Sequence, residues 1–345
     1  MMASLISFLF VIGVCVIVHE TGHFITARML DVQVHEFSFG MGPLLAQRAG
    51  RNTTWSLRAL PVGGFVRLAG MGEERDGEEV AEGKGFYDKA PWKRFLVLFN
   101  GSLFNILLAM LLTATFLYGH GVLDLTTTTV GEIIEGYPAQ SAGVLPGDRL
   151  LAIAGQDVSS WREMSEGIRA AAAKGPVDIA LERDGERIAM SVTIPPDEQG
   201  ITLLGIRPAL KRYPAGEALT SALSYTVEMT VEMLRSIIRF IIGAEKVDVA
   251  GPVGIASMAG EAARKGLWTF VTFLALINLN LGLLNLFPFP ALDGGRLVFT
   301  VGEMILRRRV PEKLENFIHM SGFVLLIMLI IYVTWQDIVN VFGWR

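Results

Sequence analysis

The pattern His19-Glu20-Thr21-Gly22-His23 combines residue types and a spacing that suit hydrolytic chemistry. Residues four apart share one face of a helix, so the two imidazoles can bind one metal ion. Glu20 lies beside them and can act as general base on a metal-bound water. The surrounding residues are apolar, and ionisable side chains within an apolar span are usually functional. We therefore interpret the pattern as a hydrolytic metal site rather than as satisfied core residues.

A catalytic zinc requires a third protein ligand and one open position for water. The chain has one cysteine, Cys15, so an intrachain disulfide and a cysteine-based zinc ribbon are both excluded. The remaining histidines lie in loops or at span edges and are poor candidates; they are His35, His120 and His319. Asp293 is the better candidate, because it follows the apolar Leu267–Leu292 segment at the same expected membrane depth as His19.

The chain around Asp293 reads Asn285-Leu-Phe-Pro-Phe-Pro-Ala-Leu-Asp-Gly-Gly295. Pro288 and Pro290 should break the helix before the aspartate. Irregular backbone at membrane depth is tolerated where it is buried in protein or lines a wet cavity. The freed backbone and the two glycines would let the carboxylate turn toward a metal. The alternative is a span that ends in a simple turn, with Asp293 as a cap.

Four apolar segments are long enough to cross a bilayer, which takes about 20 residues. They run from Leu5 to about Ala27, from Phe95 to Tyr118, from Leu267 to Leu292 and from Phe317 to Trp335. Of the 345 residues, 51% are hydrophobic and 19% are charged, which argues against a disordered or nucleic-acid-binding chain. The first segment lacks a basic leader and a cleavage site, so we expect a retained span rather than a signal peptide.

The distribution of lysine and arginine predicts the orientation of these spans. Ten such residues lie between spans one and two, from Arg28 to Arg94, and five lie between spans three and four, from Arg296 to Lys313. The N-terminal leader has none, and the C-terminal tail has only Arg345. We therefore expect both basic loops to face the cytoplasm. Both termini and the long segment between spans two and three should be extracytoplasmic.

The segments between the spans have patterns of their own. Residues 53–60 and 65–68 are rich in β-branched and aromatic types around the turn signal Pro61-Val-Gly-Gly64, so we expect a small hairpin at the cytoplasmic membrane face. Residues 72–89 are rich in Glu, Gly and Asp, which predicts a mobile loop. Residues 217–243 are amphipathic, which suits an interfacial helix and equally a linker helix.

Residues 125–209 are expected to form a compact α+β domain. Strands are predicted at 129–134, 149–153, 177–181, 188–193 and 201–206, helices at 139–142 and 161–173, and a hairpin turn at Asp184-Gly185. The run Tyr137-Pro-Ala-Gln-Ser-Ala-Gly-Val-Leu-Pro-Gly-Asp148, continued to Val158, resembles bacterial PDZ domains. Such domains bind extended peptides by adding a strand to a sheet edge. A plain structural module is the alternative.

Taken together, the motifs resemble the site-2 protease family of intramembrane zinc metalloproteases, and more closely its bacterial regulator-of-sigma-E protease branch. HExxH in the first span and N-x-x-P-x-P-x-L-D-G-G at the end of the third carry the resemblance. Further similar stretches are Phe37–Pro43, Gly64–Met71, Phe99–Asn105 and Asn278–Asn285. One departure is a single PDZ-like domain, where the form resembled has a tandem pair.

The resemblance implies one zinc ion per chain. Its implied ligands are His19, His23 and Asp293, its catalytic residue is Glu20, and its substrate-binding residues are Asn280 and Asn285. For the two asparagines, interhelical hydrogen bonding is the alternative. The implied activity is hydrolysis of peptide bonds within transmembrane segments of single-span proteins, such as an anti-sigma factor or remnant signal peptides. The implied location is the bacterial inner membrane, and the implied contacts are these substrates, the lipid bilayer and a peptide at the PDZ domain, but no nucleic acid.

We predict a polytopic α-helical membrane protein with four transmembrane helices, a cytoplasmic-face β-hairpin region and an inserted extracytoplasmic α+β PDZ domain. The expected parts are span one with HExxH (1–30), the hairpin and loop (31–90), span two (91–119), the PDZ domain (125–209), an amphipathic helix and linker (215–265), span three (266–295), a basic loop (296–316) and span four (317–337).

Two other classes of function remain open. A transporter could carry polar residues at broken helices, but no inverted repeat is visible and HExxH would be a coincidence. A PDZ membrane scaffold would need the extracytoplasmic domain and no metal. Zinc content and the effect of Glu20→Gln separate both classes from a protease.

Overall fold

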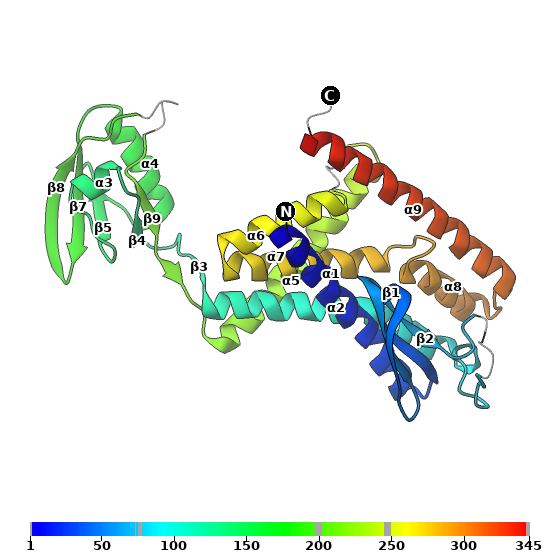
Figure 1. Ribbon diagram of the computed structural model, residues 1–345. Helices are drawn as coiled ribbons and strands as arrows, with labels where there is room; N and C mark the ends of the chain where they lie inside the picture. Colours follow the sequence, from blue (N-terminus) through cyan, green and yellow to red (C-terminus); the bar gives the residue numbers. More distant parts are fainter. Residues whose placement is uncertain (1, 73, 75–77, 197–201, 245–249, 343–345) are drawn as a thin grey trace. The chain divides into compact units, whose positions relative to one another are not determined.

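The computed structural model describes residues 2–72, 74, 78–196, 202–244 and 250–342 (Figure 1). The chain forms two compact units. The first unit comprises residues 1–116 and 219–345 and carries both HExxH and Asp293. The second unit comprises residues 117–218.

Four helices of the described chain are long and apolar enough to cross a membrane. They are α1 (Met2–Met29), α2 (Pro91–Gly119), α7 (Leu267–Leu286) and α9 (Glu312–Phe342). The four predicted spans are therefore confirmed as helices of sufficient length. The third helix ends at Leu286 rather than Leu292, because Phe287 is extended (φ −65°, ψ 139°) and the prolines after it cannot continue a helix.

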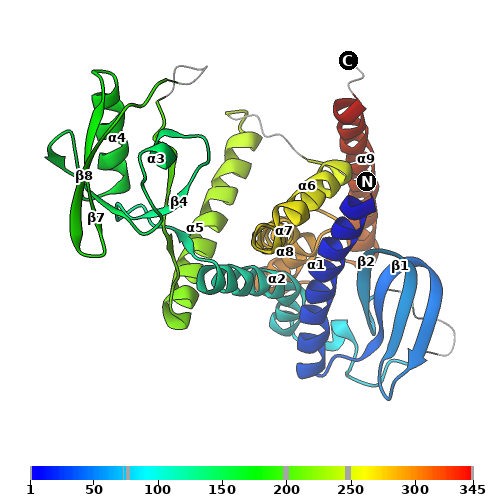
Figure 2. The same ribbon diagram turned by 60° about the vertical axis from the view of Figure 1, so that its left-hand side comes forward.

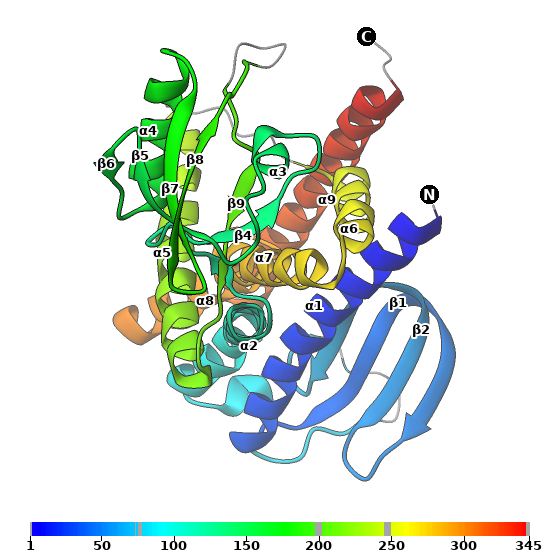
Figure 3. The same ribbon diagram turned by 90° about the vertical axis from the view of Figure 1, so that its left-hand side faces the viewer.

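Three further helices accompany the spans. α5 (Ala215–Ile241) covers most of the amphipathic segment, and α6 (Pro252–Lys265) packs against α1, α7 and α9, as Figure 3 shows. α8 (Asp293–Leu306) begins at Asp293 and replaces most of the basic loop expected over 296–316. That expectation is wrong because Leu297 and Thr300 are buried on one side of α8, which makes the basic segment a packed amphipathic helix.

Strands β1 (Val34–Ala49) and β2 (Thr54–Leu68) form an antiparallel hairpin beside α1 (Figure 2). The predicted hairpin is present, but its turn lies at residues 50–53 and not at 61–64. β2 runs on through the Pro-Val-Gly-Gly stretch, and its two ends pair with opposite sides of β1. Phe37 accordingly faces both Trp55 and Val66. The sequence could not show this, because strand signals do not reveal which segments pair.

The segment between β2 and α2 is held against the hairpin. Phe86, in the short 3-10 helix η1 (Phe86–Asp88), is buried, and its N–H donates to the carbonyl of Ala69 at 2.7 Å. The N–H of Gln33 donates to the carbonyl of Lys84 at 2.9 Å. The expectation of a mobile loop is therefore wrong for residues 84–89, since backbone bonds fix them. Residues 73 and 75–77 of that expected loop lie outside the described residues.

The second unit is an α+β module. Its elements are β3 (Val122–Leu123), β4 (Val130–Ile133), α3 (Pro138–Ser141), β5 (Arg149–Ile153), β6 (Gln156–Asp157), α4 (Trp161–Ala172), β7 (Val177–Arg183), β8 (Glu186–Val192), β9 (Ile206–Pro208) and β10 (Leu210–Lys211). One sheet has the order β6-β5-β7-β8, and β4 pairs with β9 and β3 with β10. The alternating pattern of β5 and β7 buries Leu150, Ile179 and Leu181 against Met164 of α4.

Most predicted elements of this unit are confirmed, including the hairpin turn at Asp184-Gly185 between β7 and β8. The strand expected over 201–206 is wrong, because β9 begins only at Ile206. Gly205 before it has φ +85°, a left-handed conformation that interrupts a strand. Residue 201 lies outside the described residues.

A buried ion pair ties the start of β5 to the end of β7. The Asp148 side chain is 1% exposed, and Arg183 donates to both of its carboxylate oxygens at 2.7 Å. The Leu145 N–H donates to the same carboxylate at 2.8 Å. These bonds favour the charged form and hold the pKa of Asp148 below its ordinary value, with the Arg183 bonds as the main cause.

Candidate metal centre

The two histidines of the HExxH pattern converge on one face of α1. His19 and His23 are both 8% exposed, and their Nε2 atoms lie 3.1 Å apart. Their rings meet edge to face, with centroids 4.6 Å apart. The four-residue spacing in an unbroken helix produces this arrangement. Two imidazole nitrogens thus point at the same small volume within the first apolar helix.

Asp293 reaches the histidines from the far end of the chain. α7 stops at Leu286, the Phe287–Leu292 turn follows, and Asp293 is the first residue of α8. Its Oδ2 lies 2.9 Å from Nε2 of His19 and 3.2 Å from Nε2 of His23. The proline-broken turn therefore delivers a carboxylate to the same volume, and these three residues form a group with metal-binding spacing.

The donor set fits a tetrahedral zinc ion. Ligands at about 2.0 to 2.1 Å from zinc in a tetrahedron are separated by about 3.3 Å, close to the three distances between these atoms. Nδ1 of His23 donates to the main-chain oxygen of Val97 at 2.7 Å, so the lone pair of its Nε2 is free to face a metal. Nδ2 of Asn285 lies 3.5 Å from Nδ1 of His19, and turning the amide over would place its oxygen there as an acceptor for the second ring.

Glu20 lies beside this group without belonging to it. Its carboxylate lies near the backbone of Val66 in β2 and within electrostatic reach of the two histidines and Asp293. A Cβ added to Gly64 would lie 3.3 Å from Cγ of Glu20, so the hairpin passes directly over this side chain. The carboxylate is held next to the place where a metal would bind, which suits a general base.

Gly101 of α2 makes room for both imidazoles. A Cβ at this position would lie 2.3 Å from Nε2 of His23 and 2.9 Å from Cε1 of His19. Only a residue without a side chain permits such an approach. α2 therefore forms one wall of the metal centre, although it supplies no ligand side chain among the described residues.

The other residues singled out in the sequence lie elsewhere. Asn280 is half-buried on α7, and its amide donates to the carbonyl of Leu276 at 3.1 Å. Nδ1 of His120 lies 3.0 Å from the carbonyl of Gly121 in the second unit. His319 contacts the Phe287–Leu292 turn instead of the metal-binding group. Of the two predicted substrate-binding asparagines, only Asn285 is close to the ligands.

Sequence reasoning missed three contributors: the carbonyl of Val97, the backbone of Val66 and the missing side chain of Gly101. The first two are backbone groups, which any residue type supplies. Gly101 lies within the Phe99–Asn105 stretch that supported the family resemblance. A glycine in an apolar helix was the one available signal for a close helix contact.

A second group of potential ligands lies at the hairpin. The ligand atoms of His35, Glu74 and Glu78 are all within 4.8 Å of one another. Arg67 forms an ion pair with Glu78, and Nε2 of His35 lies 2.8 Å from Oε2 of Glu74. Both carboxylates of the group therefore already contact a side chain of the protein, Arg67 or His35.

Comparison with known proteins identifies the family. The model of peptidase family M50 matches residues 7–329. The chain belongs to peptidase family M50. It is 34% identical over 332 residues to a protein of Clostridium acetobutylicum, covering 95% of each chain, and 31% identical over 366 residues to one of Mesorhizobium japonicum, covering 98% of this chain and 99% of the relative. Both relatives are provisionally named zinc metalloproteases. The M50 chain described here is accordingly a metalloprotease.

Two solved PDZ domains are similar to part of this chain. They come from SdrC-like proteins of Listeria monocytogenes and Listeria innocua, with 20% and 23% identity and TM-scores of 0.21 and 0.22. They cover 24% and 26% of this chain and 85% and 99% of the solved domains. A likeness at this level does not establish the fold, so the PDZ domain stays a prediction from the sequence.

Proposed function

We propose that this M50 metalloprotease is an intramembrane zinc endopeptidase that cuts single-span proteins within their transmembrane segments. One observation carries the proposal: two nitrogens from α1 and one carboxylate oxygen of Asp293, the first residue after the turn that follows α7, lie within 3.2 Å of one another. Both α1 and α7 are apolar enough to lie in a bilayer. A hydrolytic centre built by two such helices acts at membrane depth, where soluble proteins do not reach.

His19, His23 and Asp293 would hold the zinc ion, and the names of the relatives support zinc as the metal. When bound, zinc supplies Lewis acidity, which polarises a peptide carbonyl and lowers the pKa of water at its open position to about 7. Glu20 takes the proton of the attacking water and passes it to the leaving amine. The hairpin strand at Gly64 passes directly beside the Glu20 side chain and restricts its position.

The substrate must become extended, because a helix hides its peptide bonds. Residues 64–68 of β2 pair with residues 34–39 of β1 and lie beside Glu20. An extended substrate that adds to this edge would run past the general base. Asn285 and Asn280 are proposed to bind the backbone that unwinding exposes. The position of Asn285 next to His19 supports its part in this.

The second unit is proposed to be an extracytoplasmic PDZ-like filter that admits substrates only after their bulky ectodomains are removed. The lysine and arginine distribution supports cytoplasmic basic loops and extracytoplasmic termini. The bacterial relatives support the inner membrane as the location. An anti-sigma factor and remnant signal peptides are the proposed natural substrates. Equal cleavage of a bulky substrate with and without residues 125–209 would contradict the filter.

The proposed function is tested by zinc content and cleavage together. We expect about one zinc per purified wild-type chain and weakened retention in Asp293→Ala, with both proteins showing a cooperative thermal transition. A reconstituted single-span substrate should be cut by the wild type and not by Asp293→Ala. A folded wild type without zinc, even after zinc is supplied, would contradict the proposal and favour a scaffold.

A further inference from the structure

The turn that delivers Asp293 contains a strained residue. Ala291, two positions before the aspartate, has φ +84°, a conformation that residues with a side chain rarely adopt. Two neighbouring N–H groups form hydrogen bonds inside the turn. The Phe289 N–H donates to the carbonyl of Phe287, and the Leu292 N–H donates to the carbonyl of Phe289. The Ala291 N–H points out of the turn. Strain of this kind persists only where surrounding contacts enforce it.

His319 of α9 supplies the outside partner. The Ala291 N–H donates to Nδ1 of His319 at 3.2 Å. His319 is 7% exposed although it lies in an apolar span. A Cβ added to Gly295 would lie 3.2 Å from Cε1 of this imidazole, and its ring meets Phe299 edge to face at 5.7 Å. One side chain therefore contacts the chain two residues before and two residues after the metal ligand.

The backbone of α9 presses on the same turn. A Cβ at Gly322 would lie 2.3 Å from Cβ of Pro290 and 2.5 Å from its carbonyl oxygen. Gly322 is three residues after His319, so both lie on one side of α9. α9 thus packs against the turn at two places: the His319 imidazole contacts Ala291, and the backbone at Gly322 contacts Pro290.

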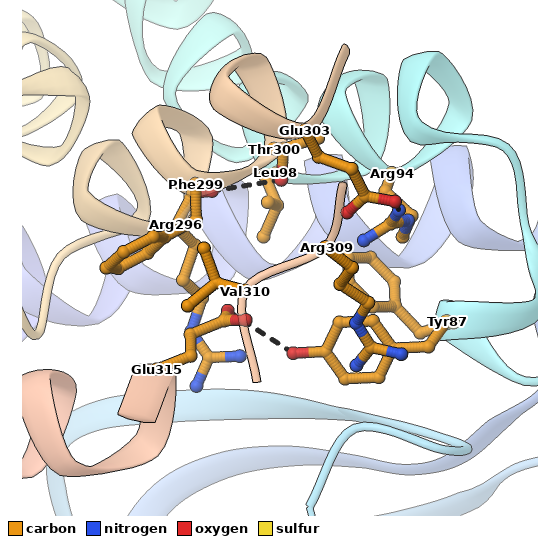
Figure 4. A pocket seen from close by; sticks show the side chains of 11 residues that line it. Tyr87, Arg94, Leu98, Arg296, Phe299, Thr300, Glu303, Arg309, Val310 and Glu315 are labelled. Carbon is orange, nitrogen blue, oxygen red and sulfur yellow. Dashed lines mark hydrogen bonds and ion pairs between the residues drawn. The ribbon is translucent and has the colours of Figure 1, made fainter. Parts of the chain in front are cut away.

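A polar network at the start of α9 fixes its position against its neighbours. Figure 4 shows this pocket, in which the Tyr87 hydroxyl donates to Oε1 of Glu315 at 3.3 Å. The guanidinium of Arg309 lies 3.6 Å from the centre of the Tyr87 ring, and Arg94 of α2 pairs with Glu303 of α8 at 2.6 Å. Glu315 is one helical turn before His319 and faces the same way. The network therefore joins α2 to α8 and η1 to the start of α9.

The imidazole acts here as an acceptor. Because Nδ1 accepts from Ala291, the ring proton is on Nε2, for which the described residues offer no hydrogen-bond partner. An asparagine carries its amide oxygen at the position of Nδ1. It can replace the single bond that His319 makes, whereas leucine cannot.

We propose that His319 is a positioning residue of the metal centre. By accepting the Ala291 N–H, it holds the strained turn in the one conformation that brings the Asp293 carboxylate to the two histidines. Its effect on the metal is indirect, since its Nδ1 accepts from Ala291 and its Nε2 carries the ring proton. The proposal rests on the proposed function, in which these three residues bind zinc.

The experiment compares full-length wild type, His319→Leu, His319→Asn and Val333→Ala in detergent. Val333 is a buried apolar residue of α9, and it controls for loosened packing of this helix. Zinc affinity is measured by competition with a chromophoric chelator. The geometry at the metal is followed by the visible absorption of the cobalt-substituted proteins.

We expect His319→Leu to weaken zinc binding about 10- to 100-fold, the usual effect of losing a group that orients a ligand. The cobalt spectrum should change as well. His319→Asn should restore both readings to near wild type, and Val333→Ala should leave them unchanged.

Two results would overturn the proposal while leaving the proposed function intact. One is wild-type zinc affinity in His319→Leu. The other is an equal loss in the leucine, asparagine and Val333→Ala proteins, which would show only loosened packing. Absence of metal binding in the wild type itself would refute both the proposed function and this role of His319.

Discussion

His23 donates its Nδ1–H to the main-chain oxygen of Val97, 2.7 Å away across the contact between α1 and α2. The bond fixes which nitrogen carries the proton and which way the ring faces. It also makes a metal ligand depend on the position of a second helix. Because the acceptor is a backbone oxygen, changing the Val97 side chain does not remove it. The orientation of the His23 ring therefore depends on how closely α1 and α2 pack, and not on the side chain at position 97.

Gly101→Ala tests that contact. The added methyl would lie 2.3 Å from Nε2 of His23, so the ring or α2 must move. We expect zinc content to fall well below that of the wild type, and cleavage to be lost. Gly302→Ala in α8 is the matched control, since its Cβ would meet nothing within 4 Å. It should be neutral or stabilising by up to about 1 kcal/mol. Equal zinc content in both variants would contradict the close approach.

Glu20→Gln should separate proton transfer from metal binding. Glu20 is not one of the three converging ligands, so zinc content should match that of the wild type. The cleavage rate should fall by about 10²- to 10⁴-fold, the usual contribution of a general base. Glu261→Gln, at an exposed ion pair on α6, is the control and should cut normally. Loss of zinc from Glu20→Gln would instead make Glu20 a ligand.

The two asparagines of α7 should respond differently to leucine. Asn285 lies 3.5 Å from Nδ1 of His19, so Asn285→Leu should weaken zinc binding as well as cleavage. The Asn280 amide donates to the Leu276 carbonyl of its own helix, so Asn280→Leu should raise KM and leave zinc affinity unchanged. Chelator competition and steady-state kinetics on one substrate measure both effects. Equal changes in zinc affinity and KM in the two variants would contradict the different roles assigned to Asn285 and Asn280.

The Asp148–Arg183 pair should make the second unit sensitive to acid. Arg183 holds the pKa of Asp148 below its unfolded value of about 3.9, so the pair stabilises the folded unit above that pH. The stabilisation is lost as the pH falls through the lowered pKa. Arg183→Gln should therefore open this unit more often at pH 7, and its difference from the wild type should shrink as the pH falls below about 3.9.

Hydrogen exchange of residues 117–218 in the full-length protein measures this difference. Arg162→Gln, which breaks an exposed ion pair with Glu166, is the control and should have little effect at either pH. A difference between Arg183→Gln and the wild type that persists unchanged at the lower pH would contradict the assigned cause.

The spans were predictable because membrane length and apolarity are properties of one segment at a time. Asp293 was a predictable candidate, since two prolines and two glycines leave little doubt that the helix breaks there. Pairing was not predictable: β2 bends through Pro61–Gly64 and places its ends on both sides of β1, and no local pattern encodes this.

His319 shows a different limit of sequence reasoning. Histidine is a common metal ligand, but the position of His319 at a span edge made it a poor candidate for a ligand. Its contact is with a backbone N–H twenty-eight positions away, and that N–H is available only because Ala291 is in a left-handed conformation. Residue types alone do not predict a left-handed backbone conformation at an alanine.

His19 and Asp293 are separated by 274 positions in the chain. During synthesis, the segment with HExxH therefore emerges long before its carboxylate partner exists. A chain that ends before α7 contains both histidines and Glu20, but it lacks Asp293, one of the three residues proposed to hold the metal.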